Sequence, residues 1–136
     1  MSIRALIIDD SASTRQMIKY HLLKMSCVVA GEAANAADGL KLFRELKPDI
    51  VTMDLMMPTH ENMDCMLAVR TMRKEAPDLV IIVVSAVPFQ KTMDSFLKEG
   101  ILHYIVKPLT SFSFDPVARK LERIFPELRP PALFPR

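Results

Sequence analysis

Short apolar runs alternate along this chain with segments whose apolar residues recur at helical spacing. Five of the runs have the length of a buried strand, and they are Ala5–Ile8, Cys27–Ala30, Ile50–Met53, Leu79–Val84 and Ile101–Val106. Runs that are apolar at every position are typical of parallel strands that are buried on both faces of a sheet. The pattern therefore predicts β/α units in a single α/β domain.

Polar capping residues and helix breakers set the limits of the predicted helices. Asn35 is expected to cap the second helix, the third is predicted over Met63 to Lys74, and Gly100 is expected to close the fourth. The final helix is predicted to use Asp115 as its cap and Pro116 as its first residue. Each strand is thus followed by a helix, which makes five helices in all.

Right-handed crossovers leave few ways to connect such a sheet. The flavodoxin-like, doubly wound order 2-1-3-4-5 places the first and third strands side by side at the point where the strand order reverses. Residues 1–125 hold all of the predicted elements and are expected to form the domain. Residues 126–136 contain four prolines and are predicted to be an extended or loosely docked tail, either inert or a docking peptide for a partner.

Four of the five strands lead into residues that can handle a phosphoryl group. The first strand runs into Asp9 and Asp10, and the third runs into Asp54. The fourth stops at Ser85, and the last stops at Lys107. Ligand chemistry in an open parallel sheet lies beyond the carboxyl ends of the strands, near the point of reversal. We therefore expect three carboxylates, a hydroxyl and an ammonium group at one edge of the sheet.

A divalent cation would relieve the repulsion among three neighbouring carboxylates. Mg²⁺ prefers hard oxygen ligands and combines one or two carboxylates with water and phosphate oxygens. Asp9, Asp10 and Asp54 supply such a set, and the backbone carbonyl of Met56 is a further candidate ligand. We expect Mg²⁺ as the cofactor, with Mn²⁺ as a substitute.

Asp54 is the preferred nucleophile because it stands alone after a central strand, whereas the paired acids suit metal binding. Lys107 and Ser85 would each hold an oxygen of the transferred group, since catalysis of phosphoryl transfer is mainly positioning and charge neutralisation. Taken singly, each of these residues has an ordinary structural explanation as a turn former, a helix cap or a solvated side chain. Because all of them are predicted to lie at strand ends, a shared role in phosphoryl transfer is favoured over these separate structural explanations.

Composition narrows the functional classes further. The chain has 136 residues, 50% hydrophobic and 25% charged, with a net charge of +2, so nothing favours binding to nucleic acid or membranes. The N-terminus lacks the pattern of a secretory signal, and a cytoplasmic location is expected by default. Cys27 and Cys65 form no disulfide framework or metal pattern, and they are expected to be buried free thiols.

Four sequence pieces resemble the receiver domain of bacterial two-component response regulators, a family that includes the single-domain chemotaxis regulator. The pieces are Leu6-Ile7-Ile8-Asp9-Asp10-Ser11, Asp54-Leu55-Met56-Met57-Pro58, Val84-Ser85-Ala86 and Tyr104-Ile105-Val106-Lys107-Pro108. Their order and spacing fit the family, and the resemblance covers about residues 3 to 125. Each piece is weak alone, but the set is specific.

The resemblance implies a role for each of these residues. Asp54 would be the phosphoacceptor, Asp9 and Asp10 the magnesium acids, and Lys107 the lysine that contacts phosphate. The implied donor is a sensor histidine kinase or a phosphotransfer protein. The implied protein is a signalling switch, not an enzyme, which catalyses only its own phosphorylation and dephosphorylation.

The resemblance also implies how the signal leaves the site. Ser85 would be the switch hydroxyl and Tyr104 the switch aromatic, although Tyr104 could equally be an ordinary strand residue. Phosphorylation would draw Ser85 inward and turn Tyr104 from an outward to an inward rotamer. This would change the face made by the fourth helix, the fifth strand and the fifth helix, where a downstream target protein would bind a monomer or a phosphorylation-dependent dimer.

Two other functions compete with this stand-alone response regulator. One is a receiver-like interaction module that works without phosphorylation. The other is a phosphohydrolase of the haloacid dehalogenase type, which needs an aspartate where this chain has Met56. The chain also departs from the family at His60-Glu61-Asn62, where a glycine turn is usual, but asparagine tolerates the left-handed conformation that such a turn requires.

Overall fold

The computed structural model describes residues 2–59 and 61–129. Its parallel sheet has the predicted strand order, β2-β1-β3-β4-β5. The strands are β1 (Ile3–Ile8), β2 (Cys27–Ala33), β3 (Ile50–Met53), β4 (Val80–Ser85) and β5 (His103–Val106). The flavodoxin-like, doubly wound fold is therefore confirmed.

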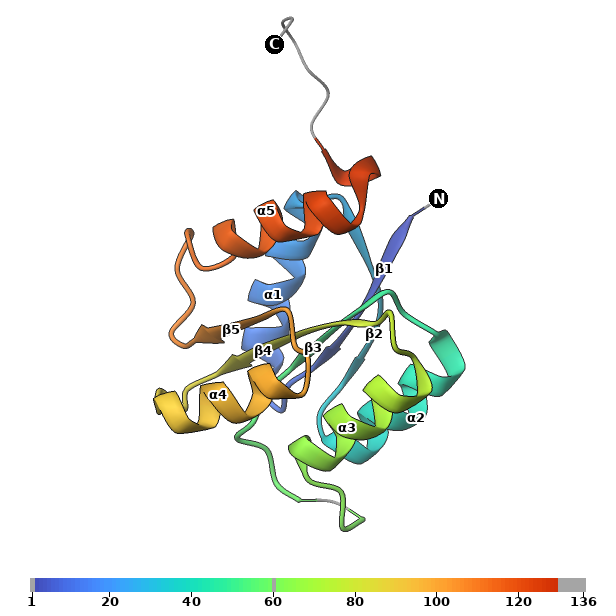
Figure 1. The fold of residues 1–136 in the computed structure, drawn as a ribbon, viewed down its shortest axis with the longest axis vertical. Helices are drawn as coiled ribbons and strands as arrows, with labels where there is room; N and C mark the ends of the chain where they lie inside the picture. Colours follow the sequence, from blue (N-terminus) through green and yellow to red (C-terminus); the bar gives the residue numbers. More distant parts are fainter. Residues whose placement is uncertain (1, 60, 130–136) are drawn as a thin grey trace, which may run out of the picture.

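Helices cover both faces of this sheet, as Figure 1 shows. They are α1 (Ala12–Lys24), α2 (Ala36–Leu46), α3 (Cys65–Glu75), α4 (Gln90–Lys98) and α5 (Asp115–Ile124), followed by a short 3₁₀ turn, η1 (Pro126–Leu128). One hydrophobic core lies under α1 and α5, and the other lies under α2, α3 and α4. Because successive strand residues face opposite cores, the central strands are apolar at almost every position.

Strand β2 is longer than predicted. The apolar run predicts an end at Ala30, before a glycine and a glutamate, which are poor strand formers. In the structure Gly31, Glu32 and Ala33 pair with the last three residues of β1, after a register shift between Ala5 and Leu6. Pairing with a central strand thus overrides local propensity, and it carries β2 to the edge where the predicted site lies.

Two of the helix ends follow the predicted capping chemistry. Asn35 caps α2, and its side-chain oxygen accepts a hydrogen bond from the Asp38 amide at 2.8 Å. Gly100 follows α4 with a φ of +87°, which favours glycine. Helix α3 begins at Cys65, two residues later than predicted, because the Asp64 side chain accepts from the Leu67 amide and caps the helix there.

The predicted cap of the last helix was wrong. Phe114 occupies the N-cap position of α5, no side chain caps this helix, and Asp115 is its first residue. The reason is tertiary, since Phe114 is buried and stacks on the His21 ring with 4.8 Å between the ring centroids. This packing draws the connection inward, and turns such as the one from the Ser113 amide to the Thr110 carbonyl bring it into helical geometry before Asp115.

The β3–α3 connection adopts left-handed backbone where the sequence lacks the usual glycine. Asn62 has a φ of +56°, as its tolerance of this conformation suggested, and Glu61 has a φ of +53°. His60 lies outside the described residues. At the other end of the chain, Leu128 packs on the core under α1 and α5, while the rest of the predicted tail, residues 130–136, lies outside the described part.

The described residues, 2–59 and 61–129, include no helix whose length and apolar character would let it cross a bilayer. The longest helix, α1, has 13 residues, and spanning the hydrocarbon core takes roughly 20.

We predict that Gly39→Ala destabilises the protein. An added Cβ would lie 2.4 Å from Cδ1 and 2.9 Å from Cγ1 of Ile8, the buried residue just before Asp9. Overpacking should outweigh the gain in helix propensity and lower the free energy of unfolding by about 1 kcal/mol. Urea denaturation measures this change. Ser95→Ala, at an exposed position of α4, is the control and should leave stability equal or higher. A Gly39→Ala protein more stable than wild type would contradict the packing argument.

Candidate functional site

The three aspartates predicted to meet do lie together. Carboxylate oxygens of Asp9, Asp10 and Asp54 lie within 4.8 Å of one another. The sheet places them there, because the Asp9 amide donates to the Ala33 carbonyl and the Asp54 amide donates to the Ile8 carbonyl, each at 3.0 Å. These two bonds continue the parallel ladders one residue beyond the strands, so the acids leave a fixed backbone.

Asp9 is fully buried and is held at both carboxylate oxygens. Its Oδ1 accepts from the Ser11 amide at 2.9 Å, and its Oδ2 accepts from Lys107 Nζ at 2.8 Å. Asp10 is exposed, so its carboxylate lies on the solvent side of the cluster. The buried acid and the exposed acid therefore form the inner and outer walls of one negatively charged site.

Asp54 is also buried, and its environment opposes ionisation. Burial raises the pKa of this carboxyl, and the charge of Asp9 raises it further. The Met56 amide, which donates to Oδ1 at 3.1 Å, and Lys107, whose Nζ lies 3.4 Å from Oδ2, oppose this shift without cancelling it. A cation that joined the cluster would thus stabilise the form of Asp54 that can act as a nucleophile.

Lys107 supplies the positive charge of the site. Burial alone would lower the pKa of its ammonium group, but contacts with Asp9 and Asp54 outweigh burial and raise it. The lysine is therefore a permanent cation between two buried carboxylates. Its backbone amide also donates to the Ser85 carbonyl at 2.8 Å, which ties the ends of β4 and β5 together.

Ser85 and Tyr104 meet at the start of the β4–α4 loop. The buried Ser85 hydroxyl accepts from the Val87 amide at 3.2 Å. The Tyr104 hydroxyl donates to the Val87 carbonyl at 2.6 Å, so this side chain reaches from β5 into the same loop. Burial raises the pKa of Tyr104, and the nearby Asp54 charge contributes to the shift. The two predicted switch residues thus hold the amide and the carbonyl of one loop residue.

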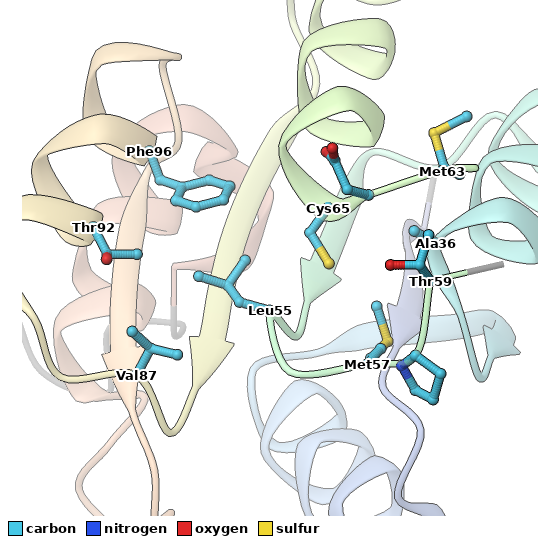
Figure 2. Close-up of a pocket in the computed structure, with 11 residues that line it drawn as sticks. Ala36, Leu55, Met57, Thr59, Met63, Cys65, Val87, Thr92 and Phe96 are labelled. Carbon is cyan, nitrogen blue, oxygen red and sulfur yellow. The ribbon is translucent and has the colours of Figure 1, made fainter.

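A pocket of about 340 Å³ lies beside the site between the β3–α3 loop and α4. Figure 2 shows Val87, Thr92 and Phe96 on one side and Met57, Thr59 and Met63 on the other, with Leu55 and Cys65 between them. Neither Asp9, Asp10 nor Lys107 lines this pocket, so it is separate from the charged cluster.

Cys65 connects the pocket wall to the phosphoacceptor candidate. Its thiol donates to the Asp54 carbonyl with a sulfur–oxygen distance of 3.2 Å. Burial raises the pKa of this thiol to about 11, so it stays protonated and unreactive at neutral pH. Cys65 is half-buried and not fully buried as expected, whereas Cys27 is buried, and no sequence signal pointed to the bond with Asp54.

Sequence reasoning also missed Arg15. Its Nη1 donates to the Asp9 carbonyl at 2.6 Å, and its Nε donates to Glu32 Oε1 at 3.1 Å. The one available signal was position, because Arg15 follows Ser11, the N-cap of α1, by one helical turn and so returns toward the end of β1. Its partner on β2 could not be read from the sequence, since β2 was predicted to end before Glu32.

The donor set fits Mg²⁺. The ligand candidates are hard carboxylate oxygens, and two of the three come from buried residues whose charges need a counterion. The role of the Met56 carbonyl stays a prediction, because the contact shown for this residue is made by its backbone amide.

A doubly wound sheet with acids at its point of reversal belongs to the class of α/β domains that bind ligands at the carboxyl ends of their strands. The family model of the response regulator receiver domain matches residues 5–114 of this chain. This protein belongs to that family, whose members are phosphoacceptor signalling modules that bind Mg²⁺ at an acidic pocket.

Relatives and solved structures agree with this assignment. The chemotaxis protein CheY of Thermotoga maritima is 42% identical over 108 residues, which cover 79% of this chain and 88% of the relative. The response regulator domain of Thermotoga maritima CheB has a TM-score of 0.72 at 28% identity, covering 96% of this chain and 100% of that one. A CheX-CheY-BeF3-Mg+2 complex from Borrelia burgdorferi shares the fold, with a TM-score of 0.77 at 23% identity over 90% of this chain and 89% of that one.

We predict that Asp54→Asn stabilises the fold at neutral pH when divalent cations are absent. The pKa of Asp54 is higher in the folded chain than in the unfolded one, so ionisation of Asp54 costs stability as the pH rises through the folded-state pKa. The variant escapes this cost. Chemical denaturation should show its advantage at neutral pH and its loss on acidification toward about pH 4, where carboxylates protonate.

Asp64→Asn is the matched control for this measurement. Asp64 is an exposed N-cap, and asparagine caps a helix equally well. Its stability should follow wild type across the same pH range. An Asp54→Asn protein that is less stable than wild type at neutral pH would contradict the raised pKa.

Proposed function

We propose that this chain is a response regulator receiver whose Asp54 accepts a phosphoryl group from a histidine kinase or a phosphotransfer protein in a Mg²⁺-dependent reaction. One observation carries the proposal. Asp9, Asp10 and Asp54 lie within 4.8 Å of one another, and Lys107 Nζ lies 2.8 Å from Asp9 and 3.4 Å from Asp54. A nucleophilic carboxylate, two acids for a metal and a fixed ammonium are the parts that phosphoryl transfer to aspartate requires.

The transfer exchanges one bond to phosphorus for another. A carboxylate oxygen of Asp54 forms a bond to phosphorus while the bond from phosphorus to the donor histidine nitrogen breaks. That nitrogen keeps the electron pair and takes up a proton. Asp9, Asp10 and Asp54 would hold Mg²⁺, which would neutralise the negative charge that builds up on the phosphoryl oxygens.

Lys107 and Ser85 serve the group once it is transferred. Lys107 is already charged and lies beside Asp54, so it can pair with a phosphoryl oxygen by a small movement of its ammonium group. The Ser85 hydroxyl now accepts from the Val87 amide. It would donate its own hydrogen to another phosphoryl oxygen, which would draw the β4–α4 loop toward Asp54.

The output is expected on the face formed by α4, β5 and α5. Tyr104 bonds to Val87 in the loop that leads into α4, so a movement of this loop reaches both α4 and β5. Phe89 just before α4, Leu97 in α4 and Val106 in β5 expose apolar side chains and are candidates for contact with a downstream protein.

A receiver-like module that works without phosphorylation is the alternative. It requires no metal site and no free nucleophile. Buried carboxylates that carry charge near one another are unfavourable without a function, and the conjunction of Asp9, Asp54 and Lys107 therefore favours the phosphorylated switch.

Incubation with acetyl phosphate and Mg²⁺ tests the proposal directly. Intact-mass measurement should show the addition of one phosphoryl group to wild type and none to Asp54→Asn. Chelation of Mg²⁺ should abolish the addition, because the carboxylates then repel the incoming group. The matched control Asp64→Asn should be modified like wild type. A folded wild-type protein that stays unmodified, or equal modification of Asp54→Asn, would favour the alternative module.

We also predict that Tyr104→Phe loosens the β4–α4 loop while it preserves phosphorylation of Asp54. The change removes the donor of the 2.6 Å bond to the Val87 carbonyl. A hydrogen bond contributes about 1 kcal/mol, so amides of this loop should exchange with solvent about fivefold faster. Hydrogen–deuterium exchange measures the rate. Tyr20→Phe, at the other of the two tyrosines, is the control, and equal rates in all three proteins would disprove the contact.

A further inference from the structure

Arg15 and Glu32 form an ion pair that reaches the backbone of the acid cluster. Arg15 lies in the first half of α1, and Glu32 is the second-last residue of β2. The guanidinium group donates through Nε to Glu32 Oε1 at 3.1 Å and through Nη1 to the Asp9 carbonyl at 2.6 Å. One side chain therefore joins α1, the end of β2 and the residue that follows β1.

The carbonyl that Arg15 holds belongs to the peptide between Asp9 and Asp10. This peptide is planar, so fixing its oxygen fixes the direction in which the chain leaves Asp9 and enters Asp10. The rest of Asp9 is held by its amide bond to Ala33 and by Lys107 and the Ser11 amide at its carboxylate. In contrast, the described residues show no hydrogen bond or ion pair to the Asp10 carboxylate. Its orientation depends on the backbone that Arg15 holds.

Glu32 restrains the guanidinium group. A free arginine so close to three acids would be attracted to their carboxylates, where it would compete with a cation. Pairing with Glu32 holds the guanidinium group against the edge strand β2. Because this group is planar, its Nη1 then donates to the Asp9 carbonyl. Only 19% of the Arg15 side chain is exposed, so the group has little room to move away.

We propose that Arg15, held by Glu32, is a positioning residue for Mg²⁺ binding, which it favours by orienting the Asp9–Asp10 peptide. This inference rests on the proposed function, because it needs the metal site at the three aspartates. Arg15 touches neither the metal nor the phosphoryl group in this role. It fixes the acids that do, as groups around metal ligands do in other sites.

The sign of one measurement separates positioning from simple charge. If Arg15 acted only as a positive charge near the site, its removal would strengthen Mg²⁺ binding by relieving repulsion. If it positions the Asp9–Asp10 peptide, its removal weakens binding. Loss of a group that orients metal ligands typically costs tenfold or more in affinity, and we expect about tenfold for Arg15→Gln.

The experiment is a titration of the full chain with Mg²⁺, followed by the NMR shifts of the Asp10 and Ser11 amides. Wild type, Arg15→Gln, Glu32→Gln and the double variant form a cycle. Glu32→Gln should weaken binding by less than Arg15→Gln does. The double variant should bind no more weakly than Arg15→Gln alone, because Glu32 acts only through the guanidinium. Arg15→Lys keeps the charge but lacks the planar fork, and it should recover only part of the affinity.

Arg44→Gln is the matched control. Arg44 pairs with Glu75 at 2.7 Å between α2 and α3, so the substitution breaks an ion pair of the same kind away from the aspartates. Its Mg²⁺ affinity should equal that of wild type. Repeating the titrations at about 1 M KCl, where the Debye length is about 3 Å, removes long-range charge effects. The loss of Mg²⁺ affinity in Arg15→Gln should persist at this salt concentration.

The outcomes are distinct. Arg15→Gln that binds Mg²⁺ as tightly as wild type or more tightly overturns the positioning role and leaves the proposed function intact. A wild-type chain whose amides do not respond to Mg²⁺ overturns the metal site itself. If Arg15→Gln does not give the spectrum of a folded protein, Glu32→Gln carries the test, and an affinity unchanged from wild type in that variant at both salt concentrations overturns the inference.

Discussion

The close approach of two buried carboxylates, Asp9 and Asp54, is the constraint on which the rest of this structure depends. They meet because β1 pairs with β3 in the sheet, although β2 lies between these two strands in the sequence. Such proximity is unfavourable unless positive charge accompanies it. Lys107, which directly follows the edge strand β5, supplies that charge, because its Nζ lies 2.8 Å from Oδ2 of Asp9 and 3.4 Å from Oδ2 of Asp54. The strand order thus brings two carboxylates into repulsion and also brings Lys107 to the place where its charge offsets that repulsion.

The two faces of the sheet give this arrangement its rigidity. Strands β1, β3 and β4 are buried between two cores, so their ends have little freedom to separate the acids. The side chains around the site are less constrained. Asp10 is exposed, and the β4–α4 loop is held at Val87 by single bonds from Ser85 and Tyr104. A fixed carboxylate beside a loop with few restraints is the arrangement that the proposed switch requires, since added charge at Asp54 would then move the loop and not the sheet.

Much of this architecture could be predicted from local sequence, for physical reasons. Continuous apolar runs identified the strands, and acids at the ends of the first and third runs led to the cluster at Asp9, Asp10 and Asp54. The failures occur where tertiary contacts decide. Asp115 was expected to cap the last helix, but stacking of Phe114 on His21 moves the helix start. Strand β2 was ended at Ala30 because its pairing with β1 is invisible in its own residues.

The early end predicted for β2 concealed the contact between α1 and β2. Once β2 is allowed to continue, Glu32 lies at the same edge as the acids and can hold Arg15 against the Asp9 carbonyl. The edge strand then contributes to the site without supplying a ligand. On the other side, Lys107, which follows β5, contacts the Asp9 carboxylate directly, whereas Tyr104 of β5 acts on the β4–α4 loop through the Val87 carbonyl. The edge strand β2 therefore affects the Asp9–Asp10 peptide, and the edge strand β5 affects the β4–α4 loop. The order β2-β1-β3-β4-β5 places these contacts at the same edge of the sheet.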